Sequence, residues 1–511
     1  MKRKLGQWAA THEWWALGMI VTVFSGVVLG NMTRWSVWFD EAFSVYLARF
    51  NIVEIAHFTS LDVHPPLYYW LLKGWMVLFG HSTLAIRSLS LVFALVGLVG
   101  LYVVVRYITK RSSYSLAAVT ATALTPVFDR FSHEARMYTL VFAIVMWATY
   151  VLLRAMKTNR RWLWVLYGVL LAAGMFTHYF VALAWLAHWA WRYREVCAGR
   201  VKKFFAREWV WCHVLAVSLF AVWLPTAVRQ FATIQVGFWI PPITPQTPIN
   251  YLTDMLFYRE VAQMDGWWAI AAFIAFAVVG AVLYFGLRQF IRQSRRGGVV
   301  LFVSLAVVPP ILLMLLSMPP LSSSFIDRYV LYAQIALAVI ISGCLLAAAK
   351  THPVLMRHCT IILIIVALAG IGNVYYYGNY NKNTNKSIRA SELMADIAEA
   401  GKAGQPVVAA SPWVYYEASF YSSNTHPVYY PASTINEDYG SLAMLKEDDT
   451  GKIADLAAFA KQHRYVWYIN VTENEIEPPV ASWKLVKKVD AYDSINRSVE
   501  YRAGLYDTSA E

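Results

Sequence analysis

Long apolar segments alternate with short polar ones over the first three quarters of the chain. Eleven of these segments are apolar enough to predict membrane-spanning helices, although several fall short of the ~20 residues that a straight span needs. They cover residues 15–32, 84–105, 114–128, 138–153, 162–176, 181–191, 210–228, 267–287, 299–316, 330–349 and 360–376. The pattern therefore predicts a polytopic α-helical membrane domain over residues 1–378.

The pattern changes after residue 378. Residues 379–511 are polar, with 18 acids and 13 bases, and short segments of helical and of alternating periodicity follow one another. Helices are predicted over 391–400 and 453–462, and strands over 406–410, 465–469, 483–489 and 499–505. A small α/β domain of about 130 residues, within the usual domain size, is expected here.

Composition agrees with this division, since the chain is 58% hydrophobic and only 15% charged, which excludes an ordinary soluble protein. The basic residues indicate orientation. Of 44 Lys and Arg, 22 fall in alternate segments that we assign to the cytoplasmic side, 9 in the opposite loops and 13 after residue 380. A cytoplasmic N-terminus without a cleavable signal peptide and an extracytoplasmic C-terminal domain are expected, in a cell membrane. The net charge of +13 is then a mark of topology, and no nucleic-acid partner is predicted.

Two predicted outer loops are long. The loop over residues 34–83 contains two weakly hydrophobic segments that we expect to be helices lying along the membrane interface. The loop over residues 238–266 contains four prolines, which predict an ordered or switchable lid rather than a helix.

Two adjacent carboxylates, Asp40 and Glu41, follow the first span directly. A charge so close to the bilayer is costly and is more often functional than incidental. A carboxylate is also the usual general base that activates a hydroxyl nucleophile. The alternative is that one of them caps a helix beginning near Ala42. Both can hold, with one residue capping and Asp40 reaching a cavity.

A second polar motif is Asp62-Val-His64-Pro-Pro. Prolines favour an extended conformation before them, and alternate residues of an extended chain share a face. Asp62 and His64 could then hold a divalent metal ion or a phosphate. The alternative is a rigid turn that starts a helix, with Asp62 as its cap.

A third motif is the run Asp129-Arg-Phe-Ser-His-Glu134-Ala-Arg136-Met-Tyr138 between two predicted spans. Here Glu134 could act as an acid and Arg136 as a phosphate clamp. Ordinary helix capping, with Ser132 as the N-cap, is the alternative. The density of ionisable groups favours a functional role.

Two further pairs, His178-Tyr179 and Arg328-Tyr329, stand at the outer ends of predicted spans. His and Tyr at an interface are usually anchors. Arg328 is the one base of its loop, and it is placed to neutralise a substrate phosphate. No Gly-rich phosphate loop, H-E-x-x-H or C-x-x-C motif is present in the sequence, so no organic cofactor is predicted.

Together these motifs resemble the GT-C glycosyltransferases, in particular the bacterial family-39-like proteins related to dolichyl-phosphate-mannose protein mannosyltransferases. The chain is also similar to lipid A aminoarabinose transferases. The matching pieces extend across most of residues 1–330. They are Phe39-Asp-Glu-Ala42, His64-Pro-Pro-Leu-Tyr-Tyr69, Arg87, Ser132-His-Glu-Ala-Arg-Met-Tyr138, Thr177-His-Tyr-Phe180 and Asp327-Arg-Tyr329. One departure is His133 beside Glu134, where Gln-Glu is commoner.

The resemblance implies inverting transfer of a hexose or pentose from a polyprenyl-phosphate donor to a protein, lipid or glycan hydroxyl on the outer face. It implies that Asp40 is the base or part of an acid pair, with Glu134 as the second acid, and that His64 contacts the donor phosphate. Glu41 is a further catalytic candidate, and Asp62 with His64 is a candidate metal site. The remaining candidates for substrate or donor-phosphate binding are Arg136, Tyr138, His178, Tyr179, Arg328 and Tyr329.

Two other functions compete with this one. In a glycolipid transporter or flippase, the charged groups would line a path instead of catalysing a reaction. The lack of charges inside the predicted spans opposes that role. In a non-catalytic membrane scaffold the acids would be helix caps and the outer domain would bind a partner.

Overall fold

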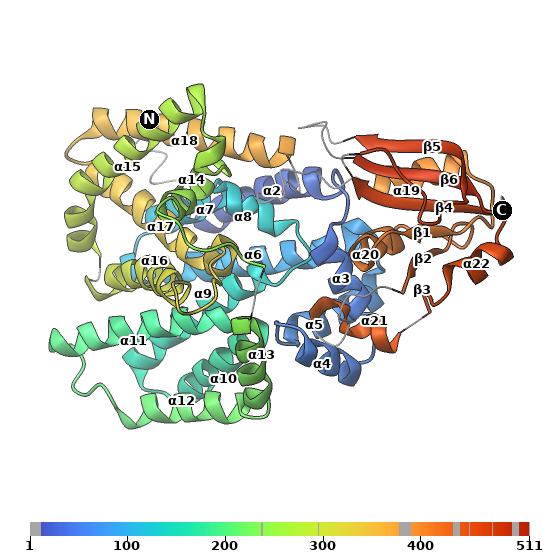
Figure 1. Ribbon diagram of the computed structural model, residues 1–511. Coiled ribbons are helices and arrows are strands. Elements are labelled where there is room, and N and C mark those ends of the chain that lie inside the picture. The colour runs from blue at the N-terminus through green and yellow to red at the C-terminus, as the bar shows by residue number, and fades with distance from the viewer. Residues whose placement is uncertain are drawn as a thin grey trace. The chain divides into compact units, whose positions relative to one another are not determined.

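The computed structural model describes residues 12–236, 239–294, 296–377, 390–432, 440–448, 450–472, 474–492 and 500–509. These residues form two compact units (Figure 1). The first unit contains residues up to Gly30, then His64–Tyr68 and Arg87–Tyr376. The second contains Asn31–Val63, Tyr69–Ile86 and the chain from Tyr377 onward. The predicted C-terminal domain therefore shares a unit with the predicted first outer loop. The basic residues 2–4 and residues 379–389 of the predicted domain lie outside the described residues.

The first unit is a helical bundle. Its helices are α2 (Glu13–Met32), α6 (Thr83–Thr109), α7 (Ser112–Ala123), α8 (Pro126–Ser132), α9 (Tyr138–Thr158), α10 (Arg161–Thr177), α11 (Ala182–Cys197), α12 (Arg207–Phe220), α13 (Leu224–Val236), α14 (Thr247–Phe257), α15 (Gly266–Gln293), α16 (Arg296–Leu316), α17 (Leu331–Ala348) and α18 (Pro353–Tyr377), with short 3-10 turns η1 (Tyr179–Val181), η2 (Val261–Gln263) and η3 (Asp327–Val330). All eleven predicted spans fall on these helices. The multi-pass helical membrane class is confirmed.

Judged by helix length and composition, fewer spans are present than the eleven predicted. Among the described residues, seven helices are long and apolar enough to cross a membrane, or eight if α12 and α13, bent by 75°, form one broken span. The predicted span 114–128 is divided into α7 and α8 at Thr125-Pro126, because proline is tolerated at a helix start but not in its interior. The predicted spans 162–176 and 181–191 correspond to α10 and α11, of 17 and 16 residues, which are too short to be counted as full spans. A count of eleven full spans is thus not confirmed.

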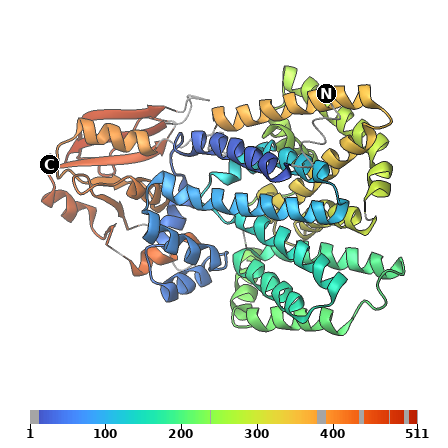
Figure 2. The same ribbon diagram turned by 180° about the vertical axis from the view of Figure 1, so that it is seen from behind.

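Helix α17 lies at the centre of this bundle. It packs against α7, α15 and α16, and 83% of its candidate span is buried, compared with 22% for α18. Close approach depends on small residues, since a Cβ added at Gly286 of α15 would collide with the Cys344 backbone of α17. At the other end of the chain, α2 lies beside α6 (Figure 2), where the Arg106 guanidinium donates to Glu13 at 3.2 Å. The sequence predicted the positions of these long helices, although α6, α15 and α18 are longer than the predicted spans.

The proline-rich loop differs from the prediction. Residues 239–246 are irregular, but Thr247–Phe257 form helix α14 with Pro248 in the first turn. Proline fits that position because N–H groups in the first turn of a helix make no intrahelical hydrogen bond, so the N–H that proline lacks is not needed. The prediction that this whole loop is not helical is therefore wrong. Phe238, where the loop was predicted to begin, lies outside the described residues.

The second unit combines three short helices of the first loop with an α/β domain. The loop helices are α3 (Phe39–Leu47), α4 (Ile52–Leu61) and α5 (Leu67–Phe79), one more than predicted. The domain contains α19 (Ala390–Ala400), β1 (Val407–Ala409), α20 (Pro412–Phe420), β2 (Val428–Pro431), η4 (Gly440–Leu442), α21 (Ala443–Glu447), β3 (Lys452–Ile453), α22 (Leu456–Gln462), β4 (Tyr465–Thr472), β5 (Lys484–Tyr492) and β6 (Glu500–Asp507). The α/β prediction is confirmed, although α20 and β2 were not predicted.

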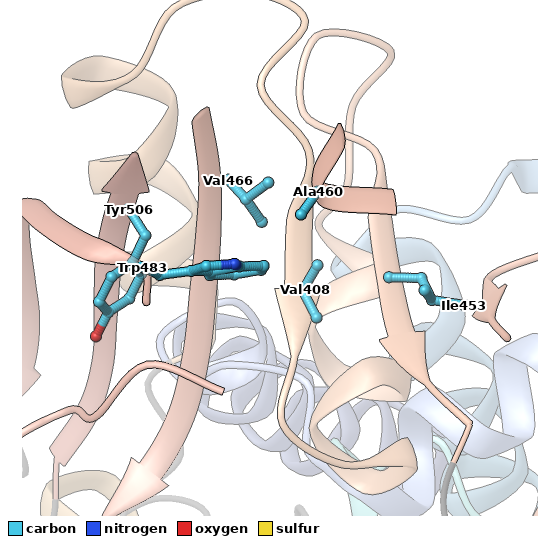
Figure 3. Close-up of a cluster of buried hydrophobic side chains, with 6 residues drawn as sticks. All are labelled: Val408, Ile453, Ala460, Val466, Trp483 and Tyr506. Atoms are coloured by element: carbon cyan, nitrogen blue, oxygen red, sulfur yellow. The ribbon is translucent and has the colours of Figure 1, made fainter. Parts of the chain in front are cut away.

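The six strands form one mixed sheet in the order β3-β2-β1-β4-β6-β5. Strands β1 to β4 pair in parallel, and β6 joins β4 and β5 antiparallel. Val408, Val466 and Tyr506 contribute to a core on one face together with Ala460 of α22 and Trp483 (Figure 3). Trp467 and Ile469, which point to the other face of β4, are buried as well. Both faces of this strand are covered, as expected for parallel pairing.

Candidate active site

In the first unit, the predicted phosphate-binding residues converge on His178. The ring of His178 lies with its centroid 5.7 Å from that of His64 and 4.6 Å from that of Tyr329. Arg136 and Arg328 are also electrostatic neighbours of His178. These four residues, His64, Arg136, His178 and Arg328, are called the cation cluster below. They come from four distant parts of the sequence, so the fold has assembled them.

The electrostatics of the cation cluster favour an anion. Burial, followed by the neighbouring His64, Arg136 and Arg328, holds the pKa of His178 well below its usual value. Its side chain is 5% exposed, and its Nε2 has no hydrogen-bond partner within the described part of the chain. Arg136 and Arg328 bring two guanidinium groups to this ring, and guanidinium groups suit the geometry of phosphate. A phosphate bound here could accept hydrogen bonds from both of them.

Aromatic rings form one wall of the cation cluster. The Arg328 guanidinium lies 5.7 Å from the ring centre of Tyr138 and 6.0 Å from that of Tyr329. The Tyr329 ring stacks on Phe180 at 5.5 Å. Tyr179 has other contacts, because its hydroxyl donates to Gln230 and accepts from the Trp223 indole at 2.7 Å. Tyr138 and Tyr329 thus adjoin the cluster, whereas the described bonds of Tyr179 join it to α13 and to the turn just before α13.

Glu134 forms a buried ion pair that the sequence analysis missed. Its Oε2 lies 2.5 Å from Nη2 of Arg130, four residues earlier, and both side chains are almost wholly buried. The Ser90 hydroxyl donates to the Glu134 carbonyl at 2.5 Å and fixes the backbone there. The capping alternative fails, because α9 begins only at Tyr138 and Ser132 ends α8. Glu134 therefore lies in the short irregular segment between these two helices.

A fully buried arginine, Arg87, also lies in this region and is an electrostatic neighbour of His133. Burial, together with Arg130 and Arg87, lowers the pKa of His133 well below its usual value, so this histidine is neutral. Sequence reasoning had a signal for Arg87, a lone charge at the start of an apolar span. No sequence signal distinguished Arg130 from the polar residues around it.

An apolar cavity of about 300 Å³ lies in the same unit. It is lined by α7, α14, α17 and α18 and by the start of α8, where Thr125 and Pro126 contribute. Helix α8 runs from this cavity toward the segment of Glu134 and Arg136. Its seven residues span about 10 Å at 1.5 Å per residue. Helix α8 thus links an apolar cavity to the beginning of the charged segment.

In the second unit, Asp40 and Glu41 have different surroundings. Both stand in the first turn of α3. Glu41 is fully buried, and its carboxylate accepts the Trp38 N–H at 3.4 Å, so Glu41 caps its own helix. Asp40 is half-buried. Glu41 thus has a capping contact, while the catalytic roles predicted for Asp40 and Glu41 stay predictions.

The candidate metal site does not have enough ligands for a metal ion. No group of three or more His, Cys, Asp or Glu side chains that could hold a metal occurs in the described ranges. Asp62 ends α4 as its C-cap residue, so it does not cap the helix that follows, and Pro65 and Pro66 lie just before α5 rather than in its first turn. Only the turn of the rigid-turn alternative is present. A metal role for Asp62 and His64 stays a prediction, and no catalytic step is assigned to a metal ion.

Comparison with known proteins agrees with this fold. Residues 63–227 match the family model described as dolichyl-phosphate-mannose-protein mannosyltransferase. The crystal structure of ArnT from Cupriavidus metallidurans in the apo state superposes with a TM-score of 0.56 at 13% identity, covering 97% of this chain and 98% of that one. The chain therefore has the fold of ArnT. The predicted resemblance to lipid A aminoarabinose transferases is thereby confirmed at the level of the fold.

Two further solved structures are similar to this chain. ArnT from Cupriavidus metallidurans bound to undecaprenyl phosphate has a TM-score of 0.54 at 14% identity, with 96% of this chain and 98% of that chain covered. The Archaeoglobus fulgidus oligosaccharyltransferase in the apo form has a TM-score of 0.49 at 13% identity, over 82% of this chain and 65% of that one. Among curated protein sequences, none matches significantly.

Proposed function

We propose that this protein is an integral membrane glycosyltransferase that moves a sugar from a polyprenyl-phosphate donor to an acceptor hydroxyl. The observation that carries the proposal is the cation cluster within a GT-C fold. Arg136 and Arg328 offer donors and positive charge to one phosphate, and His64 and His178 offer ring nitrogens. A related fold, that of ArnT, has been determined with undecaprenyl phosphate bound.

The apolar cavity beside α8 supports a lipid-linked donor. A polyprenyl chain is uncharged and would gain about 25 cal/mol for each Å² of apolar surface removed from water. The cavity lies where such a chain could run toward the charged segment that follows α8. A nucleotide sugar has no comparable apolar part and remains in the cytosol, whereas the proposed site faces the outer side.

The proposed reaction is a single displacement. The acceptor oxygen attacks the anomeric carbon, and its proton passes to the Asp40 carboxylate. The bond between the anomeric carbon and the donor phosphate oxygen breaks, and polyprenyl phosphate leaves with the bonding electrons. The cation cluster stabilises the negative charge that develops on that phosphate. One displacement inverts the anomeric configuration. In this scheme Glu134 is the second acid.

Purified protein in detergent, supplied with a radiolabelled polyprenyl-phosphate sugar and an acceptor lipid or peptide, tests the proposal. Transfer should occur with the wild type and fall at least a hundredfold in Asp40→Asn. Arg328→Gln should raise the KM for the donor, because Arg328 contacts the phosphate and not the acceptor. Movement of labelled lipid across vesicles without any product would instead indicate a transporter and contradict the proposal.

A further inference from the structure

The segment that carries Asp40 is bound along its length by the C-terminal domain, within the second unit. The Ser36 and Ser391 hydroxyls lie 2.6 Å apart, and the Ser391 N–H donates to Ser36 at 3.1 Å. The Val37 N–H donates to the Tyr421 hydroxyl at 2.6 Å. These bonds join the chain just before α3 to two different parts of the domain. The approach to α3 is therefore fixed from outside the loop.

Helix α3 itself packs on α20 through aromatic rings. The ring of Tyr416 meets Phe39 at 5.8 Å, Phe43 at 6.1 Å and Tyr46 at 5.2 Å between centroids. The Tyr46 hydroxyl donates to Asp448 at 2.9 Å. Residues 39, 43 and 46 are spaced by four and three, so they share one face of α3. That face is covered by the domain, and Asp40 lies one position beyond Phe39.

The next residue of α20, Glu417, reaches the first turn of α3. Its side chain is only 6% exposed. Its carboxylate accepts the backbone N–H of Phe39 and the hydroxyl of Tyr501 in β6, and Asp40 is its charged neighbour. Phe39 is the first residue of α3, whose N-terminal N–H groups lack intrahelical acceptors. Glu417 therefore caps α3 from another part of the chain.

We propose that Glu417 is a positioning residue that holds the first turn of α3 and thereby sets the orientation of Asp40. The inference rests on the proposed function, in which Asp40 is the base. Asp40 directly follows Phe39, whose backbone N–H is bonded to Glu417, so a change at Glu417 reaches Asp40 through one peptide unit. The C-terminal domain then contributes directly to the reaction, although it carries no reacting group.

The electrostatics agree with this geometry. Burial, and then the negative charge of Asp40, raise the pKa of Glu417 to about 7, against the opposing effect of the bonds from Tyr501 and Phe39. The groups that face Glu417 are thus the Asp40 carboxylate from α3, the Phe39 amide and the Tyr501 phenol from β6. Below pH 7 Glu417 is mostly neutral, whereas above pH 7 it places a second negative charge beside the Asp40 carboxylate.

The test compares Glu417→Gln and Glu417→Ala with Glu447→Gln. Glu447 is in the same domain but half exposed, paired with His57 at 2.8 Å, so it controls for charge removal. Glu417→Ala should lower kcat at least tenfold with the KM for the donor within twofold, because the cation cluster belongs to the other unit. The wild-type kcat should show an inflection near pH 7 that Glu417→Gln lacks and Glu447→Gln keeps.

Hydrogen–deuterium exchange of the peptide over residues 38–43 gives a second measurement on the full chain. Exchange should be faster in Glu417→Ala than in Glu447→Gln, and near the wild-type rate in Glu417→Gln, whose amide oxygen can still accept from Phe39. Wild-type kcat, pH profile and exchange in both Glu417 variants would overturn the inference. If Asp40→Asn is inactive in the same assays, the proposed function survives that result. An active Asp40→Asn would instead remove Asp40 as the base.

Discussion

The contribution of the Arg130–Glu134 ion pair to stability can be measured by removing one charge and then both. Glu134→Gln leaves Arg130 buried without its carboxylate and should lower the free energy of unfolding by about 3–5 kcal/mol. The double variant Arg130→Met with Glu134→Leu replaces the pair by apolar groups and should recover most of that loss. Thermal unfolding in detergent measures both effects.

The same double variant tests the role of Glu134 in the reaction. Because Glu134 is proposed as the second acid, the stable double variant should still transfer sugar at least a hundredfold more slowly than the wild type. Wild-type transfer by the double variant would show that the pair only stabilises the fold.

The pKa of Glu417 also predicts how stability depends on pH. Its pKa in the folded protein, about 7, is above its ordinary value of 4.5. Between these two pH values, Glu417 is therefore mostly protonated in the native protein and mostly ionised in the unfolded chain. The stabilisation is complete below pH 4.5 and is lost as pH rises through 7, on the order of 3 kcal/mol in all. The difference in thermal midpoint between wild type and Glu417→Gln should therefore change between pH 5 and 8. A constant difference over this range would contradict the prediction.

Some residues of the candidate site could be predicted from sequence and some could not. Arg136 and Arg328 were recognised because a charge at the end of an apolar span is costly and therefore indicates a functional role. Arg130 was missed, since nothing in a run of six ionisable or polar residues shows which side chains will face each other. Glu417 could not be found at all, because its role depends on Phe39, which is 378 positions away in the chain.

Helix α18 forms part of the cavity wall, and its glycines offer a matched pair of substitutions. A Cβ at Gly370 would collide with Pro126 and would lie 2.7 Å from the Leu256 carbonyl, and both these residues line the cavity. A Cβ at Gly372 would meet nothing within 4 Å. Gly370→Ala should displace α18 and raise the KM for the polyprenyl donor severalfold, whereas Gly372→Ala should not.

The comparison is direct because both glycines are on the same helix and both substitutions add one methyl group. Equal KM values for the two variants, with both proteins folded, would mean that the cavity does not hold the donor chain.

At this scale, sequence periodicity predicted where helices lie better than how they end. The long helices α6, α15 and α17 were located because an apolar run is a local property. The division of α7 from α8 was missed, although Thr125-Pro126 marks it. The error at α14 was the opposite one, because Pro248 was taken as a helix breaker when it occupies the first turn.

The orientation of the whole chain can be tested through its cysteines. Cys197 is exposed, whereas Cys212, Cys344 and Cys359 are buried. The distribution of Lys and Arg places Cys197 on the cytoplasmic side and the C-terminal domain outside. A membrane-impermeant maleimide should label the wild type in inverted vesicles and not in intact cells. A Lys461→Cys variant, with the new thiol on exposed α22, should gain labelling from outside.

Labelling of wild-type Cys197 from outside intact cells would show that the chain has the orientation opposite to the predicted one. It would also place the C-terminal domain in the cytosol, where a flipped lipid-linked donor is not needed.

The grouping into two units was not predictable, because sequence patterns report local structure and not long-range pairing. Apolar runs and the change in composition after residue 378 indicated a membrane domain and an α/β domain. They did not indicate that residues Asn31–Val63 and Tyr69–Ile86 would group with the chain from Tyr377 onward. That grouping depends on specific contacts such as the one between Tyr46 and Asp448.

The discontinuity of the second unit has a consequence for biosynthesis. A ribosome makes the chain from its N-terminus, so α3 emerges several hundred residues before α20, against which it packs, and before β6, whose Tyr501 bonds Glu417. During that interval Phe39, Phe43 and Tyr46 lack the Tyr416 ring that they contact in the mature protein. The nascent protein must therefore be almost complete before α3 can adopt its mature surroundings. A nonsense mutation even near the 3′ end of the gene, one that removes β6, would deprive Glu417 of Tyr501 and so weaken its hold on α3.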